Sequence, residues 1–295
     1  MNPLDSIARA MGMLLHFIYN NISFGSYGLA IIIFTFIIKA VLLPLTIKQY
    51  KSTARMQELQ PQIQEVQRRY KNDKDKLNQE LMKVYTDNKV NPTGGCLPLL
   101  VQMPILFSLY WVISQPLKFM LGKSTDVINQ LLQAINGDLI NSGHATASSP
   151  DLTIIRFFTE NPDKLANVEG LLKKEELLNM NFLGLNLGLQ PSFSYNPELG
   201  WQYFGLLLIP VLAGLTTYIS VKYSTAKTTQ QSTDNQMANQ MTNSMTTIMP
   251  FMTAFFAFSV PAGLGLYWIT SNVIQVLQQA YLNRFVLKKK EVATK

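Results

Sequence analysis

The sequence predicts an all-α integral membrane protein with five transmembrane helices, and its composition and its apolar stretches carry that prediction. Hydrophobic residues make up 47% of the 295 residues and charged residues 15%, against about 25% charged residues in a typical soluble domain. An apolar helix of about 20 residues crosses the hydrocarbon core of a bilayer. The stretches that we expect to span the membrane are residues 27–47, 97–117, 201–221, 245–260 and 261–283.

The fourth predicted span is the shortest. Its 16 residues give about 24 Å of helix, which is less than the roughly 30 Å of the hydrocarbon core. Pro261 and Gly263, which disfavour helix, mark the boundary with the last span. Local thinning of the bilayer would accommodate a span of this length.

Lysine and arginine residues predict the orientation of the spans, because cytoplasmic loops of membrane proteins are enriched in them. Residues 48–92, 222–244 and 284–295 contain 17 such residues, whereas residues 1–26 and 118–200 contain seven. We therefore expect the N-terminus outside and the C-terminus in the cytoplasm, where the last of these segments forms a basic tail. The same asymmetry accounts for the net charge of +7, so we do not expect DNA as a partner.

Residues 1–26 are expected to form an outer amphipathic N-terminal helix. Their apolar residues recur at helical spacing, at Leu4, Ile7, Met11, Leu14, Leu15 and Ile18. This pattern is typical of a helix that lies on a membrane surface. The segment has no basic region followed by a clean apolar core, so we expect no signal peptide.

Residues 48–92 are expected to form a cytoplasmic helical hairpin resembling a coiled coil. Their apolar residues have spacings of three and four, at Met56, Leu59, Ile63, Val66 and Tyr70. The polar segment 71–76 predicts a turn, after which the apolar pattern resumes. Such a hairpin is either a solvated structural element or a docking platform for a ribosome or a nascent chain.

Residues 118–200 are expected to form an extracytoplasmic segment, with amphipathic helices over 127–135 and 165–178. The sequence contains no recognisable catalytic motif and no phosphate-binding glycine loop. Its two histidines, His16 and His144, lack the spacing of metal ligands. We therefore expect neither enzymatic activity nor a metal or other cofactor.

The first predicted span contains one charged residue, Lys39. A lysine at the centre of a spanning helix costs about 2.5–3.5 kcal/mol on insertion scales, and no predicted span contains an acidic residue. Water, polar side chains of the bundle or snorkelling towards the cytoplasmic surface must offset this cost. The polar residues that we group with Lys39 are Thr35, Gln102, Trp268, Ser271, Asn272, Gln275 and Gln279. They either line a hydrophilic groove open to the cytoplasmic leaflet or join helices by hydrogen bonds.

Four stretches of the chain resemble the YidC/Oxa/Alb family of membrane-protein insertases. They are FTFIIKAVLLPLTIKQYKS (34–52), MQELQP (56–61), VNPTGGCLPLLVQMPILFSLYW (90–111) and IMPFMTAFFAFSVPAGLGLYWITSNVIQVLQQ (248–279). The resemblance covers roughly residues 27–117 and 201–285, and the stretches follow one another in the order of the family.

The resemblance implies a hydrophilic cationic groove that receives nascent membrane proteins and releases them into the lipid bilayer. It implies a multi-pass protein of the bacterial plasma membrane that works alone or beside the Sec translocon, with the ribosome as a further partner. Thr35 and Trp268 fall where the family has groove or client-contact residues. Lys39 falls where the family usually has arginine, which keeps the charge but changes its hydrogen-bonding geometry.

The polar, low-complexity segment 222–244 predicts a cytoplasmic loop. Methionines continue from it into the fourth span at helical spacing, and those that we propose as client contacts are Met241, Met245 and Met249. Flexible, polarizable thioethers suit varied apolar partners, although plain packing or lipid contact would explain the same pattern.

The residues alone also allow a second class of function. A transporter of small solutes or ions would use Lys39 as an anion site. The sequence argues against it, because five spans give no even inverted repeat.

Overall fold

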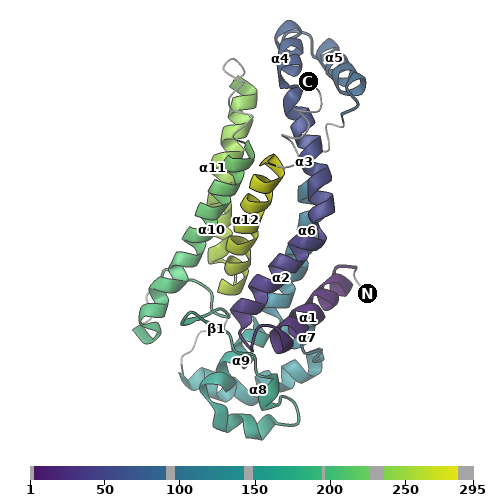
Figure 1. Ribbon diagram of the computed structural model, residues 1–295. Helices are drawn as coiled ribbons and strands as arrows, with labels where there is room; N and C mark the ends of the chain where they lie inside the picture. The colour runs from purple at the N-terminus through teal and green to yellow at the C-terminus, as the bar shows by residue number, and fades with distance from the viewer. Residues whose placement is uncertain (1–2, 91–96, 143–148, 195–196, 226–235, 285–295) are drawn as a thin grey trace. The chain divides into compact units, whose positions relative to one another are not determined.

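The computed structural model describes residues 3–90, 97–142, 149–194, 197–225 and 236–284, and these are predominantly helical (Figure 1). The helical class predicted from the sequence is thus confirmed. The α-helices are α1 (Pro3–Asn21), α2 (Tyr27–Val41), α3 (Leu43–Glu58), α4 (Gln60–Arg69), α5 (Lys74–Asp87), α6 (Leu97–Ser114), α7 (Pro116–Phe119), α8 (Thr125–Ser142), α9 (Pro150–Glu160), α10 (Trp201–Thr225), α11 (Gln236–Phe258) and α12 (Ala262–Leu282). The remaining described elements are the 3-10 helices η2 (Pro162–Val168), η3 (Lys174–Glu176) and η4 (Pro197–Leu199) and the strands β1 (Asn181–Phe182) and β2 (Leu185–Asn186).

The chain divides into two compact units. The first unit contains Met1–Ile38, Pro104–Thr217 and Pro250–Asn272. The second unit contains Lys39–Met103, Tyr218–Met249 and Val273–Lys295.

The first predicted span is interrupted after Val41. Helices α2 and α3 meet at a break at Leu42, where the chain bends by 60°. Pro44 lies in the first turn of α3, a position where its missing N–H is not needed. Because proline cannot donate to the carbonyl four residues earlier, it also prevents α2 from continuing unchanged into α3.

Among the described residues, one helix is long and apolar enough to cross a membrane, namely Trp201–Ser224 of α10. The bent pair α2–α3 qualifies as a second if it is one span, and Gln102–Ser114 and Thr247–Phe258 are apolar but shorter. Helix α12 has 21 residues, but its serine, asparagine and glutamines lower its mean hydropathy. The number of spans and their orientation therefore remain predictions.

In the first unit, α1 buries its apolar stripe against protein. Met11, Leu15 and Ile18 are buried and belong to the main hydrophobic core, and α1 contacts α7. Part of the stripe that predicted a surface helix thus packs on the protein core, which offers it a dry partner, and contact of α1 with a membrane surface remains a prediction. The apolar side chains that α1 leaves most exposed are Met13 and Phe17, at 63% and 57%.

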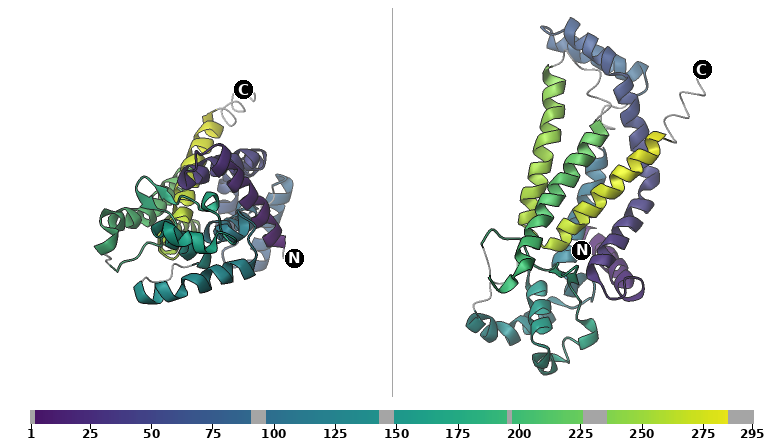
Figure 2. Two further views of the ribbon diagram at one scale, coloured as in Figure 1. Left: turned by 90° about the horizontal axis from the view of Figure 1, so that it is seen from below. Right: turned by 60° about the vertical axis from the view of Figure 1, so that its left-hand side comes forward.

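The start of α9 is fixed to the junction between α6 and α7. The Asp151 carboxylate accepts a hydrogen bond from the Lys118 backbone N–H (3.1 Å) and so satisfies an amide in the first turn of α7. The Ser149 hydroxyl donates to the Ser114 carbonyl. Helix α9 also contacts α7 and α8, and the teal segments of this region lie close together in both views of Figure 2.

The buried Asp151 makes the stability of the first unit depend on pH. Burial raises the pKa of this carboxyl from 3.8 to about 6, although backbone N–H groups of Lys118 and Leu117 favour its charged form. Because the folded state binds the proton more tightly than the unfolded state, stability falls as pH rises from about 4 through about 6. We expect the wild type to lose about 1 kcal/mol between pH 5 and pH 7 relative to Asp151→Asn. Unfolding of both proteins in detergent at pH 5 and pH 7 measures this. An equal change in the free energy of unfolding for the wild type and Asp151→Asn would contradict it.

The region 165–178 does not form the α-helix that its leucine spacing predicted. Leu165, Val168, Leu172 and Leu178 are buried in the core, but the backbone forms 3-10 turns η2 and η3. Gly170, which separates these turns and has no side chain to pack, disfavours a continuous α-helix. The other predicted helix of this segment, over 127–135, lies within α8.

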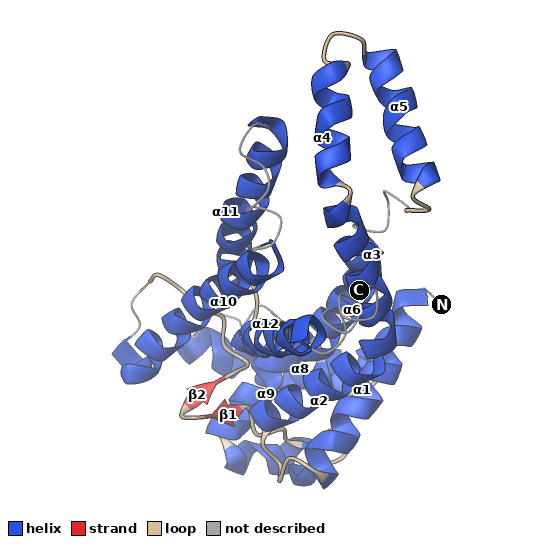
Figure 3. Cartoon of the chain, turned by 45° about the horizontal axis from the view of Figure 1, so that its top comes forward, coloured by secondary structure: helices blue, strands red, loops and turns tan. Residues whose placement is uncertain are grey.

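In the second unit, α4 and α5 form a helical hairpin (Figure 3). Its buried residues are Leu59, Ile63 and Val90, and the residues packed on them are Met56, Leu81, Val84 and Tyr85. The turn is shorter than the predicted 71–76, because the Asp73 carboxylate accepts from the Lys76 N–H (3.0 Å) and caps α5. The apolar residues of α5 are half-buried against those of α4, and whether the hairpin also docks a partner remains a prediction.

Candidate functional site

The predicted groove residues belong to both units. Thr35, Trp268, Ser271 and Asn272 belong to the first unit. Lys39, Gln102, Gln275 and Gln279 belong to the second. These polar side chains therefore form two sets, one in each unit, and a single groove formed by both remains a prediction.

In the first unit, Asn272 joins α12 to α10. Its Nδ2 group donates to the hydroxyl oxygens of Thr217 (2.8 Å) and Thr216 (3.3 Å). Each threonine hydroxyl donates in turn to its own helix, Thr217 to the Ala213 carbonyl at 2.7 Å and Thr216 to the Leu212 carbonyl at 2.8 Å. Of the two roles that the sequence allowed, lining a groove or joining helices by hydrogen bonds, Asn272 has the second.

The other members of this set are less engaged across helices. Thr35 is fully buried, and its hydroxyl donates to the Ile31 carbonyl at 2.6 Å, within α2. Ser271 is buried, whereas Trp268 is half-buried and packs on the main hydrophobic core. The hydroxyl of Thr35 can still accept a hydrogen bond from a neighbouring group.

In the second unit, Lys39 is half-buried in the last turn of α2. Within the part of the chain that the structure describes, no carboxylate forms an ion pair with its ammonium group. Its backbone carbonyl accepts a hydrogen bond from the Nε2 group of Gln278 (3.3 Å). This carbonyl lies just before the break at Leu42, so Gln278 bonds a backbone group near the end of a helix.

Gln279 is the most buried glutamine of this set, with 5% of its surface exposed. Its Nε2 group donates to the Ser224 hydroxyl of α10, and its Oε1 atom is buried without a partner. The Nε2 group of Gln49 is likewise buried without a partner. Among the described residues of the second unit, Gln279 thus leaves a buried acceptor unused and Gln49 a buried donor, which is a costly arrangement in a dry environment.

The remaining predicted residues differ in how far they are exposed. Gln275 and Gln102 are half-buried. On α12, the apolar Val273, Leu277 and Tyr281 are the exposed residues, at 47%, 64% and 61%. Of the methionines, Met249 is 40% exposed, and the side chains of Met241 and Met245 lie outside the described residues.

Sequence reasoning missed four polar residues of these sets: Thr216, Thr217, Ser224 and Gln278. The adjacent threonines in an apolar span were the available signal for the first two. The predicted polar stripe of the last span included Gln275 and Gln279, which are four residues apart. Gln278 lies next to Gln279 and outside this spacing, so the stripe did not include it. Ser224 lies beyond the predicted end of its span.

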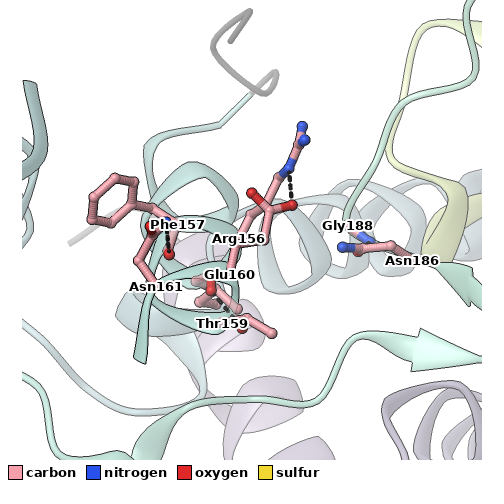
Figure 4. A network of polar contacts seen from close by, with 8 residues as sticks. Arg156, Phe157, Thr159, Glu160, Asn161, Asn186 and Gly188 are labelled. Atoms are coloured by element: carbon pink, nitrogen blue, oxygen red, sulfur yellow. Dashed lines mark hydrogen bonds and ion pairs between the residues drawn. The ribbon is translucent and has the colours of Figure 1, made fainter. Parts of the chain in front are cut away.

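A small cavity in the first unit lies between α9 and the β1–β2 hairpin. Of its lining residues, Arg156, Thr159, Asn186 and Gly188 appear in Figure 4 within a network of polar contacts. The Arg156 Nε group donates to Glu160 at 2.8 Å, Asn161 donates to the Phe157 carbonyl at 3.0 Å, and the Gly188 N–H donates to Asn186 at 2.9 Å. These groups bond within their own segments. Among the described residues, no cluster of histidine, cysteine or acidic residues could hold a metal ion.

Apolar helices joined by hydrogen bonds between asparagine, threonine, serine and glutamine side chains, with a half-buried lysine in one of them, are typical of helical membrane proteins. Residues 17–290 match the family model described as 60Kd inner membrane protein. The chain belongs to this family, which confirms the resemblance found in the sequence.

The similar proteins are described as membrane protein insertase YidC. The Haemophilus influenzae (strain Rd) protein is 30% identical over 283 residues, which are 96% of this chain and 38% of that protein. The Bradyrhizobium diazoefficiens protein is 31% identical over 94% of this chain and 36% of its own length. The Oceanobacillus iheyensis protein is 31% identical over 90% of this chain and 77% of its own length. The chain therefore spans less than two-fifths of the first two relatives and about three-quarters of the third.

Proposed function

We propose that the chain is an insertase and chaperone for membrane proteins in a bacterial plasma membrane. It would cross the membrane five times, with the N-terminus outside and the C-terminus in the cytoplasm. Nascent hydrophobic segments would enter a hydrophilic groove and leave it into the lipid, with the chain acting alone or beside the Sec translocon and receiving clients from the ribosome. Relatives described as insertases that match over 90% or more of this chain support the proposal.

The observation that carries the mechanism is Lys39, a half-buried cation in an apolar helix. Because none of the described carboxylates pairs with this cation, it is free to attract one from a client's translocating tail. It also holds water, which lowers the barrier for polar client residues that must cross the bilayer. No proton transfer or covalent step is needed, so the proposal is for a non-enzymatic protein.

Reconstitution of the purified chain into phospholipid vesicles tests this function. We expect vesicles containing the chain to insert a single-span client with a short acidic tail several times faster than empty vesicles, as measured by protection of the tail from added protease. The same vesicles should show no saturable uptake of small anions. Saturable anion uptake without client insertion would support the transporter alternative and overturn the proposal.

A further inference from the structure

Two large apolar side chains lie at exposed turns of the first unit in an unfavourable backbone conformation. Phe24 has φ 52° and is 95% exposed, and Leu183 has φ 51° and is 80% exposed. A positive φ brings the Cβ atom of an L-residue close to its own backbone, so glycine and asparagine are the usual residues there. Each is followed by a glycine with positive φ, Gly25 at 70° and Gly184 at 76°.

Leu183 and Gly184 form the tip of the β1–β2 hairpin (Figure 3). Strand pairing joins Asn181 to Asn186 and Phe182 to Leu185, which leaves a two-residue loop. Two-residue loops with positive φ at both positions are type I′ turns, which favour Asn-Gly. A leucine at the first position therefore strains the turn, and its side chain gains little contact within the protein.

The stem of this hairpin is firmly held, so the tip has a defined position. A Cβ atom added at Gly28 of α2 would lie 2.2 Å from the Phe182 ring, and one added at Gly205 of α10 would lie 2.4 Å from Leu185. The Asn179 N–H also donates to the Tyr19 hydroxyl at 2.8 Å, which ties the segment before β1 to α1. The hairpin is thus fixed to the N-terminal parts of α2 and α10, and the segment before it to α1.

The tip continues the exposed apolar face of α10. A Cβ atom added at Gly184 would lie 2.5 Å from the Trp201 ring, so this indole lies directly against the tip. From Trp201, the exposed apolar face of α10 continues through Phe204, Leu208 and Val211, at 62%, 57% and 57%. Helix α10 is long and apolar enough to cross a membrane, and tryptophan favours the boundary between lipid and water.

We propose that Leu183 and Phe24 are lipid anchors, which insert into the boundary between phospholipid headgroups and acyl chains beside the first turns of α10 and α2. Transfer of their side chains from water into lipid compensates the strain of the two turns. The anchors fix the depth at which these helices begin in the bilayer. This inference requires the chain to lie in a membrane and does not depend on insertase activity.

Spin labelling of the full chain in vesicles of phosphatidylethanolamine and phosphatidylglycerol tests the proposal, because lipid is then the sole partner present. Single cysteines are placed at Leu183 and Phe24 in a Cys96→Ser background and carry a nitroxide. Ala166, an exposed residue of η2, is the aqueous control, and Leu208 is the lipid control. We expect the ratio of oxygen to nickel-chelate accessibility at both anchors to exceed that at Ala166 at least about threefold.

A ratio at Leu183 and Phe24 equal to that at Ala166 would overturn the proposal. A second measurement needs no substitution. Wild-type chain is irradiated in vesicles that contain a phospholipid with a diazirine near the start of its acyl chain. Mass spectrometry should find adducts on the peptides of Phe24 and Leu183 and none on the peptide of Ala166. Absence of adducts at both anchors, with adducts present on α10, would also count against it.

Discussion

Replacing Lys39 by glutamine or glutamate is expected to reduce insertion of acidic-tailed clients at least tenfold, while Lys39→Arg keeps activity near that of the wild type. A pair of unit charges 4 Å apart gains about 4 kcal/mol at an effective dielectric of about 20. Desolvation offsets most of this gain, and a remainder of about 1.4 kcal/mol corresponds to a factor of about ten. Glutamine keeps polarity but loses the attraction, and glutamate repels an acidic tail.

Growth of an insertase-depleted strain, together with insertion of acidic and neutral clients, measures this effect. Lys48→Gln is the matched control, because Lys48 is an exposed lysine on the next helix, and it should change insertion little. All variants must reach equal abundance in the membrane. If Lys39→Gln and Lys39→Glu insert acidic clients as well as the wild type, Lys39 is a tolerated interface lysine and the charge mechanism fails.

Gly12→Ala is expected to destabilise the first unit by about 3 kcal/mol, since overpacking against a rigid neighbour is among the most damaging core changes. A Cβ atom at Gly12 of α1 would lie 2.2 Å from the Phe119 carbonyl oxygen and 2.6 Å from its carbon. Both are backbone atoms of α7 and cannot rotate away. The two helices must therefore separate, which exposes the buried stripe of α1.

Gly137→Ala provides the matched control for this prediction. Gly137 is an exposed residue of α8, and a Cβ atom there would meet nothing within 4 Å. Alanine should then stabilise the helix by about 0.5–1 kcal/mol. Unfolding of both variants in mixed micelles gives the comparison. Equal effects of the two substitutions would show that α1 and α7 do not approach as closely as the structure has them.

Much of the fold follows from short-range patterns. The apolar seam of residues 56–70 predicted the α4–α5 hairpin because two helices with such stripes can bury them against each other. The break at Leu42 was not predicted, since LLPL reads as uninterrupted apolar sequence when hydropathy is averaged. The β1–β2 hairpin was also missed, because two-residue strands are too short to show alternation.

The candidate site was predictable in its residue types more than in its contacts. Asn272 was selected because it is polar in an apolar span, but its partners Thr216 and Thr217 lie on a helix more than 50 positions away in sequence. Helical spacing relates residues within one helix and contains no information about which face of another helix it meets. The same limit applies to Gln278, whose partner is a backbone carbonyl.

The break at Leu42 also changes the electrostatic surroundings of Lys39. In a continuous helix over 27–47 this lysine would occupy a middle turn, where the dipoles of preceding and following peptides cancel. Because α2 ends at Val41, Lys39 lies in its last turn, where the peptide dipoles sum to about half a negative charge. A cation at this position is stabilised by about 0.3–1 kcal/mol at a surface and by up to about 2 kcal/mol when partly buried. The interrupted helix thus supplies a counter-charge to Lys39 that leaves its ammonium group available to a carboxylate.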